Sequence, residues 1–510
     1  MSCEPLPPNV QLHVLRPLSP LERYYTIRQE LNYYKNIISY VRYTHTKLSL
    51  IPFANVRSEV TPILYRALRS LILTHPALSA AFFCIKSNSP SFVHIPVGVQ
   101  ELERLMEAQH DIGFNQDNFN IPLWRVVFVL NKARRNELGV FFVYHHGIGD
   151  GQSSFAFHNF FYKFLNENLD LFDPNRSKLD VTALSKEAKV DVPLRPHPQP
   201  INERISLRPP LHKIVPLIAP HIIIPSFIRT FTENEYWAGD IPSKSLDTYH
   251  TKVKIFTLTK DELQKVYGYA KNEDSTIHAA LYAAVLFSAA KYLVTVTVTS
   301  NSKFKKKSTL SLKIPTPISL RPTVNPPISQ NEIGVYLTEF TSNSLVRIIH
   351  QTEFWKLARE WRRDFLKNKP EAMHKIWLLR FVGERYEEWI KLLKGWRFAK
   401  ENGGMGRNAS GEISNLGRWI VTDEKRDSTD PKVSMKEEKW AIIDMTFSQC
   451  AYVVGSAFNI NVVTHSDNFR GTVTYQKGAI SDDKMEKFVR GLIDALKCVA
   501  EKGDVKFGEL

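Results

Sequence analysis

Two adjacent histidines and an aspartate follow an apolar run in the sequence FFVYHHGIGDGQSS, residues 141–154. The ordinary pKa of histidine lies near neutrality, so such a side chain can accept a proton from a hydroxyl or an amine at physiological pH. His146 is therefore a candidate general base, for example while the hydroxyl attacks an acyl carbonyl. Asp150 can pair with a cation or accept backbone N–H bonds, which would fix the loop.

The glycines at 147, 149 and 151 let this loop turn tightly and leave space for a substrate. A metal site is an alternative, but His145 and His146 are neighbours, whose side chains point to opposite faces of a strand. The sequence also has no HExxH pattern and no G-x-S-x-G turn for a serine nucleophile. Proton transfer is therefore favoured and no metal is expected, while a purely structural histidine stays open.

The segments around the motif predict a strand, then the loop, then a helix. Residues 122–130 and 137–146 are apolar runs separated by a charged turn, typical of paired buried strands. After the glycines, apolar residues recur at helical spacing, so the free N–H groups of a helix start should face a cleft. The members of this apolar stripe are Phe157, Phe160, Phe161, Phe164 and Leu165.

Further elements follow along the whole chain. A helix over 57–75 should stop at Pro76, and a later one, with its apolar stripe over 354–365, at Pro370. Helix starts are expected at Ser19, at Ser275 or Thr276, and at Ser481. The remaining predicted elements are a helix over 372–396 and strands within 36–53, 78–85, 91–97, 294–300, 310–322, 411–421, 449–465 and 470–480.

A chain of 510 residues is too long for one ordinary core, because single domains seldom exceed ~250–300 residues. Strands and helices mix in both halves, which predicts an α/β fold. We expect an N-terminal subdomain over 1–180, a proline-rich crossover over 181–251 and a C-terminal subdomain over 252–510.

The net charge of +15 favours anionic partners. Zinc-finger spacing and RNA-binding signatures are absent from the sequence, so nucleic acid is not expected. The four dispersed cysteines suit a reducing compartment, and the chain begins without a secretory signal pattern. We expect a cytoplasmic monomer. The alternative is peripheral contact with the endoplasmic reticulum or lipid droplets, through residues 214–227 and an aromatic segment holding Tyr24, Tyr25, Tyr33, Tyr34 and Tyr40.

The motif HHGIGDG matches the His-His-x-x-x-Asp-Gly signature of the CoA-dependent acyltransferase superfamily, which includes chloramphenicol acetyltransferase. Other stretches resemble the fungal alcohol O-acetyltransferase family, and the likeness spans nearly the whole chain in the expected order. These stretches are RPLSPLERYY, PLWRVVFV, STIHAALYAAVL, PISLRP, ISNLG and FSQCAYVVGSAF.

This resemblance implies two chloramphenicol-acetyltransferase-like subdomains with a central tunnel between them. It implies transfer of an acetyl or short acyl group from acetyl-CoA, as a co-substrate, to the hydroxyl of a small apolar alcohol or secondary metabolite. No cofactor would be bound permanently. His146 would be the general base for direct attack without an acyl-enzyme, and His146 and Asp150 are the candidate catalytic residues.

The resemblance also implies roles for other residues. Asp150 would form a salt bridge to an arginine, for which Arg321 is the first candidate and Arg125 the second. His145 and Gly151 would support the loop. Oxyanion or tunnel candidates are Ser414, Asn415, Ser448 and Gln449. Lys305 and Lys306, within the run Lys303–Lys307, could bind a phosphate of CoA, although a mobile solvated loop is the favoured explanation of this run.

Three functional alternatives stay open. An N-acetyltransferase acting on an amine, such as a sphingoid-like base, would use the same histidine. A carrier protein could deliver the acyl group in place of free CoA. A non-catalytic member of the fold could bind an apolar ligand. ISNLG departs from the Asp-Phe-Gly-Trp-Gly motif of the plant branch, so that branch is not favoured.

Overall fold

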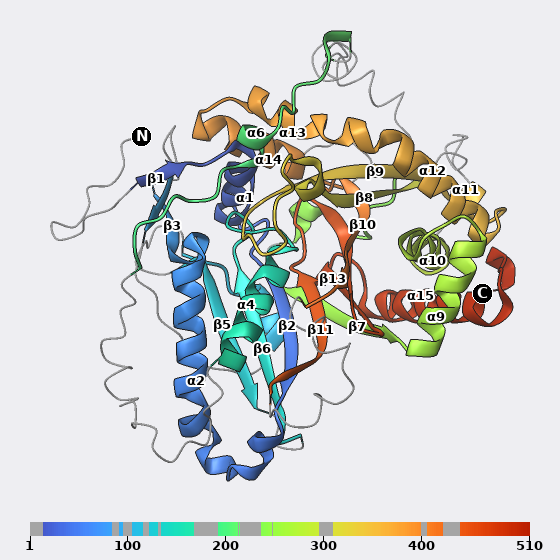
Figure 1. Cartoon of the computed structure of the whole chain (residues 1–510). Helices are drawn as coiled ribbons and strands as arrows, with labels where there is room; N and C mark the ends of the chain where they lie inside the picture. The colour runs from blue at the N-terminus through green and yellow to red at the C-terminus, as the bar shows by residue number, and fades with distance from the viewer. Residues whose placement is uncertain are drawn as a thin grey trace.

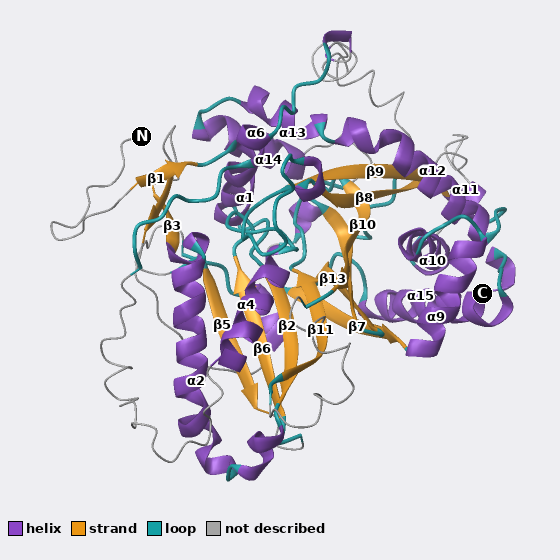
Figure 2. Cartoon of the chain, viewed as in Figure 1, coloured by secondary structure: helices purple, strands orange, loops and turns teal. Residues whose placement is uncertain are grey.

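Two four-stranded sheets lie side by side at the centre of the structure, with helices on their outer sides (Figure 1). The computed structural model describes residues 14–83, 91–94, 105–115, 122–130, 134–167, 192–212, 214, 236–246, 248–294, 310–398, 405–421 and 439–509. Helices and strands mix throughout this part of the chain (Figure 2). The fold is therefore of the mixed α/β class, as predicted.

The first sheet has the antiparallel strand order β11-β2-β6-β5. Helices α2 and α4 pack together against it, and α3 lies over the opposite face. Both faces are thus covered, which explains why β6 is an uninterrupted apolar run instead of an alternating one. The bounds are β2 Ile37–Thr44, β5 Trp124–Leu130, β6 Glu137–Tyr144, β11 Ala441–Gln449, α2 Phe53–Thr74, α3 Leu105–Asp111 and α4 Ser153–Glu167.

The second sheet has the order β10-β12-β13-β7, and only its β10–β12 pair is parallel. Three helices, α9, α10 and α15, pack on one side of it (Figure 1). The helix α10 is apolar all round and almost wholly buried. The bounds are β7 Thr251–Leu258, β10 Ala409–Trp419, β12 Ser456–His465, β13 Asn468–Gln476, α9 Lys260–Asn272, α10 Ile277–Tyr292 and α15 Asp482–Lys502.

Smaller elements surround the two central sheets. A three-stranded sheet has the order β1-β4-β3, and β8 pairs with β9 in a hairpin closed by residues 320–336. Their bounds are β1 Val14–Pro17, β3 Ala80–Phe83, β4 Ser91–His94, β8 Ser311–Ser319 and β9 Leu337–Leu345. The remaining helices are α1 Pro20–Glu30, α6 Ile201–Arg204, α11 Val346–Ile349, α12 Phe354–Ala372, α13 His374–Leu378 and α14 Tyr386–Phe398.

The C-terminal part of the chain contributes a strand to the first sheet. Strand β11 pairs along its whole length with β2, from Ala441 opposite Thr44 to Gln449 opposite Ile37. Trp440 and Phe447 are buried in the core of that sheet. The proposed boundaries after residues 180 and 251 stay a prediction, since residue 180 lies outside the described ranges.

The predicted strands and helix around the motif are confirmed as β5, β6 and α4. Helix α2 ends at Thr74, before Pro76, and α15 begins after Ser481. Of the two caps proposed for α10, Thr276 is the N-cap, because its hydroxyl accepts the N–H of Ala279.

Two sequence predictions were wrong. Pro370 does not end α12; it lies in the last turn, and the helix stops at Ala372. The single helix over 372–396 is two helices, because Gly383 adopts a left-handed backbone with φ +87° between α13 and α14. The strand predicted within 449–465 is β12, which begins only at Ser456 because a loop follows the end of β11 at Gln449. The predicted strand over 294–300 lies almost wholly outside the described residues, as does nearly all of 214–227.

Candidate active site

A cavity of about 260 Å³ lies between the two central sheets, and His146 and Asp150 line it. One part of its wall comes from α1, β2 and the motif loop. The rest comes from β8, β9, β10, α13, α14, the segment between these two helices, and the end of β11 with the loop that follows up to the start of β12. The cavity thus occupies the position at which the sequence predicts a tunnel, and the motif faces it.

His145 turns away from the cavity and supports the loop. Its Nδ1 accepts the N–H of Gly147 at 2.7 Å, which closes the turn directly after β6. Its ring lies edge-on to Phe82 and Phe114. Burial lowers the pKa of His145 to about 3, so the ring is neutral and its Nδ1 can act as the acceptor. This geometry agrees with the supporting role that the resemblance implies.

His146 is buried, with 5% of its surface exposed, and its ring stacks on Tyr25 of α1. The two ring centroids are 3.6 Å apart and the planes differ by 9°. Burial is the main cause that lowers the pKa of His146 to about 3; the Arg28 cation adds to this, whereas the backbone of His146 and the Asp150 carboxylate oppose it. The imidazole is therefore neutral at physiological pH, which is the form that accepts a proton.

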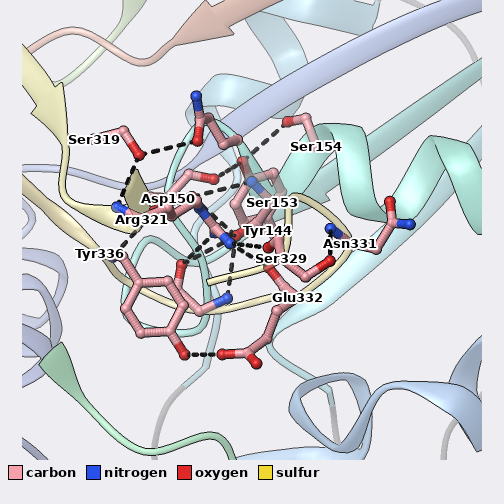
Figure 3. Close-up of polar contacts among 12 residues, drawn as sticks. Tyr144, Asp150, Ser153, Ser154, Ser319, Arg321, Ser329, Asn331, Glu332 and Tyr336 are labelled. Atoms are coloured by element: carbon pink, nitrogen blue, oxygen red, sulfur yellow. Dashed lines mark hydrogen bonds and ion pairs between the residues drawn. The ribbon is translucent and has the colours of Figure 1, made fainter. Parts of the chain in front are cut away.

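Although Asp150 is part of the cavity lining, its carboxylate is held by four hydrogen bonds (Figure 3). Its Oδ1 accepts from Arg321 Nη2 at 2.9 Å and from the N–H and hydroxyl of Ser153, while Oδ2 accepts the N–H of Tyr336 at 3.0 Å. The ion pair expected with Arg321 is thus present, and both side chains are buried.

Arg321 ties the β8–β9 connection to the motif loop. Its Nη1 donates to the carbonyls of Ser329 and Glu332, each at 2.9 Å, and its guanidinium lies over the ring of Tyr336. In return, the N–H of Asp150 donates to the carbonyl of Gly334. The other proposed partner, Arg125, donates instead to Gln109 and to the carbonyl of Ile112, so it does not pair with Asp150.

Gly151 lies close against side chains of β10 and β11. A Cβ on this residue would lie 2.5 Å from Leu416 Cδ2 and 3.1 Å from Phe447 Cζ. Both neighbours come from strands of the C-terminal part of the chain, β10 and β11, and both line the cavity. The glycine therefore lets the motif loop and these strands form one continuous wall.

The four oxyanion or tunnel candidates divide into two groups. Ser414, Asn415 and Gln449 line the cavity with His146, although Gln449 is engaged by Tyr34, Tyr452 and Glu412. Ser448 is not part of the lining; its hydroxyl bonds to His110 at 2.8 Å. The structure thus brings Ser414 and Asn415 together with His146 and leaves Ser448 outside.

A cationic group in the cavity was missed by sequence reasoning. Arg28 of α1 is buried among tyrosine rings beside His146. Glu412 of β10 also lines the cavity, and burial, as the main cause, raises the pKa of its carboxyl to about 7. The aromatic N-terminal segment was a signal for this group, but it was assigned to membrane contact; the structure buries Tyr25, Tyr33 and Tyr34 instead.

The phosphate-binding candidates Lys305 and Lys306 lie outside the described residues. Among the residues that the structure describes, no cluster of histidine, cysteine and carboxylate side chains is arranged to hold a metal ion. None of the helices described is both long enough and apolar enough to cross a membrane.

A family model described as "Alcohol acetyltransferase" matches residues 98–495 of this chain. The chain is 24% identical over 415 residues to "Probable alcohol acetyltransferase crmB" of Aspergillus fumigatus, covering 77% of this chain and 76% of the relative. It is 22% identical over 347 residues to "Probable alcohol acetyltransferase FCK4" of Fusarium pseudograminearum, covering 67% of this chain and 63% of that relative.

Solved structures share the two-sheet architecture. TRI3 trichothecene 15-O-acetyltransferase from Fusarium sporotrichioides matches with a TM-score of 0.63 at 11% identity, over 95% of each chain. The condensation domain of the Monacolin K polyketide synthase MokA matches with a TM-score of 0.54 at 10% identity, over 98% of this chain and 99% of that one. The predicted chloramphenicol-acetyltransferase-like fold with two subdomains is thereby confirmed.

Proposed function

The chain belongs to the alcohol acetyltransferase family, and from that premise we propose that it transfers an acetyl group from acetyl-CoA to the hydroxyl of an alcohol or secondary metabolite. One observation carries this proposal: a neutral, buried histidine of the motif lines a cavity between the two central sheets. The family membership supplies the reaction class, and the geometry supplies the base.

His146 acts as the general base through its Nε2. Its Nδ1 is fully enclosed by protein, so Nε2 is the nitrogen that a substrate in the cavity can reach. The stacked ring of Tyr25 fixes the plane of the imidazole. A base held in one orientation loses little entropy when it meets the hydroxyl, which favours proton transfer.

The reaction proceeds by direct attack of the acceptor. The hydroxyl oxygen forms a bond to the thioester carbonyl carbon while its proton passes to His146. The carbon–sulfur bond then breaks, and the proton moves from His146 to the sulfur of CoA. Bringing both substrates to one imidazole replaces a covalent acetyl-enzyme.

Ser414 donates to the oxyanion that forms in this attack. Its hydroxyl lines the same cavity as His146, and within the described part of the chain it forms no hydrogen bond to another residue. The Asn415 Oδ1 accepts the N–H of Gly417, which leaves the Nδ2 group of Asn415 as a second donor beside the cavity. A free hydroxyl in a site with little water is a stronger donor than one in bulk solvent.

The acceptor enters a largely apolar cavity. Leu21, Pro315, Pro317, Ile318 and Ile376 contribute to its wall. Apolar side chains of this kind suit the hydrocarbon part of an acceptor whose hydroxyl is directed at His146. Acetyl-CoA is the donor that the family membership supports.

The test is incubation of the purified chain with labelled acetyl-CoA and a panel of alcohols, sterols and amines. We expect labelled esters from the intact chain, none above background from His146→Ala, and unchanged turnover from His212→Ala, whose ring is exposed. Intact mass spectrometry after incubation with acetyl-CoA alone should show no acetylated protein. The proposal fails if no acceptor is labelled, or if His146→Ala retains full turnover. Labelling of amines alone would support N-acetylation instead.

A further inference from the structure

Arg28 is a buried cation in the wall of the proposed acceptor cavity. Only 4% of its surface is exposed, and it projects from α1 into the space that His146 also lines. Four tyrosine rings surround its guanidinium carbon, with centroids 5.1 Å away for Tyr24, 6.0 Å for Tyr25, 4.7 Å for Tyr34 and 4.6 Å for Tyr452.

No carboxylate among the described residues forms an ion pair with Arg28, and its buried Nε has no hydrogen-bond partner there. The nearby Glu412 accepts instead from Gln449 and Tyr452. Lys375, the other basic side chain of the lining, does have a counter-charge, because its Nζ lies 3.9 Å from a carboxylate oxygen of Glu339. A buried charge without a counter-charge is costly, and aromatic faces offset only part of that cost.

Arg28 lies at the same end of the cavity as the base. Tyr25 stacks on His146 and borders Arg28, and Tyr34 also contacts both groups. One small molecule can therefore reach both side chains at once. Any anionic group bound at Arg28 would belong to a substrate whose reacting atom is at His146.

We propose that Arg28 binds a carboxylate of the acceptor, so that the preferred acceptor is a hydroxy acid. This inference rests on the proposed acetyl transfer. A guanidinium presents parallel N–H groups that fit a carboxylate in a bidentate pair, and the carboxylate supplies the missing counter-charge. The same cation repels a protonated amine placed beside it.

The competing explanation is that Arg28 only holds the four tyrosine rings in place. A structural role predicts that its removal weakens all acceptors alike. A carboxylate-binding role predicts a loss confined to acceptors that carry a carboxylate. The two explanations therefore differ in a ratio of rates for matched acceptors.

The experiment compares kcat/KM for straight-chain ω-hydroxy acids of increasing length, their methyl esters and the corresponding alcohols, with acetyl-CoA as donor. We expect the wild-type chain to prefer the acid over its ester. Arg28→Met should lower kcat/KM for the acid about 10- to 100-fold, because a charge-assisted hydrogen bond is lost. The kcat/KM values for the ester and the alcohol should change little. Arg363→Met, an exposed position on α12, is the control and should match the wild type.

An equal loss for all three acceptors in Arg28→Met, or no preference of the wild type for any acid over its ester, overturns the inference. If Arg28→Met does not fold, the ratio of kcat/KM for the acid to kcat/KM for its ester in the wild-type chain decides alone. If no acceptor is acetylated, the proposed function fails by itself. Calorimetric binding of decanoate then decides this inference: weaker binding to Arg28→Met supports it, and equal binding overturns it.

Discussion

Arg321 Nη2 lies 2.9 Å from Asp150 Oδ1, and the two side chains are exposed by only 2% and 4%. The pair joins the loop after β6 of the first sheet to the connection between β8 and β9. Because Asp150 is fully engaged in holding that connection, we propose that its part in the reaction is to position the loop of His146.

Removing the arginine should destabilise the chain strongly. Arg321→Met leaves the Asp150 carboxylate buried without its cation, and we expect the free energy of unfolding to fall by about 3–5 kcal/mol in urea denaturation. The double variant Asp150→Asn with Arg321→Met should recover part of this loss, because no charge is then buried alone. Arg363→Met serves as the surface control. Equal stability of Arg321→Met and the wild type would contradict the account.

The two serine candidates should behave in opposite ways. Ser414→Ala removes the proposed oxyanion donor and should lower kcat about 100-fold with little change in stability. Ser448→Ala deprives the buried Nε2 of His110 of its partner, so it should cost about 1–3 kcal/mol of stability and leave kcat unchanged. Steady-state kinetics and urea denaturation of both variants test this. A normal kcat for Ser414→Ala would exclude it as the donor.

Stability should fall as the pH drops below about 6.5. Burial is the main cause that lowers the pKa of five histidines to about 3, and these are His110, His145, His146, His158 and His197. In the unfolded chain these rings titrate near pH 6.5, so between about pH 6.5 and 3 only the unfolded state binds the protons. Each ring then removes up to about 1.4 kcal/mol per pH unit, and the full stability is present above pH 6.5.

Urea denaturation at pH 7, 6 and 5 measures this slope. The ring of His158 lies away from the cavity and is hydrogen-bonded to Ser39 and Tyr43. His158→Gln should therefore reduce the slope of stability against pH by the contribution of one histidine. His212→Gln, at an exposed position, should leave the slope unchanged. A stability that is constant from pH 7 to pH 5 would refute the linkage.

The strand, loop and helix around the motif could be predicted from local sequence. The apolar run of β6 and the helical spacing of Phe157, Phe161 and Leu165, all buried in α4, are signals within one short segment. The Asp150–Arg321 pair joins residues 171 positions apart. It was expected from the resemblance and not from any spacing.

Other features depend on contacts that no local pattern encodes. Alternating apolar and polar residues indicate a strand but not its partner strand, so the pairing of β11 with β2 could not be predicted. Arg28 is surrounded by Tyr24, Tyr25 and Tyr34 of its own segment, but also by Tyr452. An aromatic stretch with one arginine equally predicts an exposed surface, and only the packed fold shows that these rings are buried.

The pairing of β11 with β2 also determines when the first central sheet can be completed during synthesis on the ribosome. Lys35 and Cys450, which touch where β2 begins and β11 ends, are 415 residues apart. Until that late segment emerges, β2 is an open edge able to pair with other nascent chains. The first central sheet is therefore completed only after residues 441–449 have been synthesised, and polypeptides truncated before residue 441 should aggregate instead of yielding an independent half.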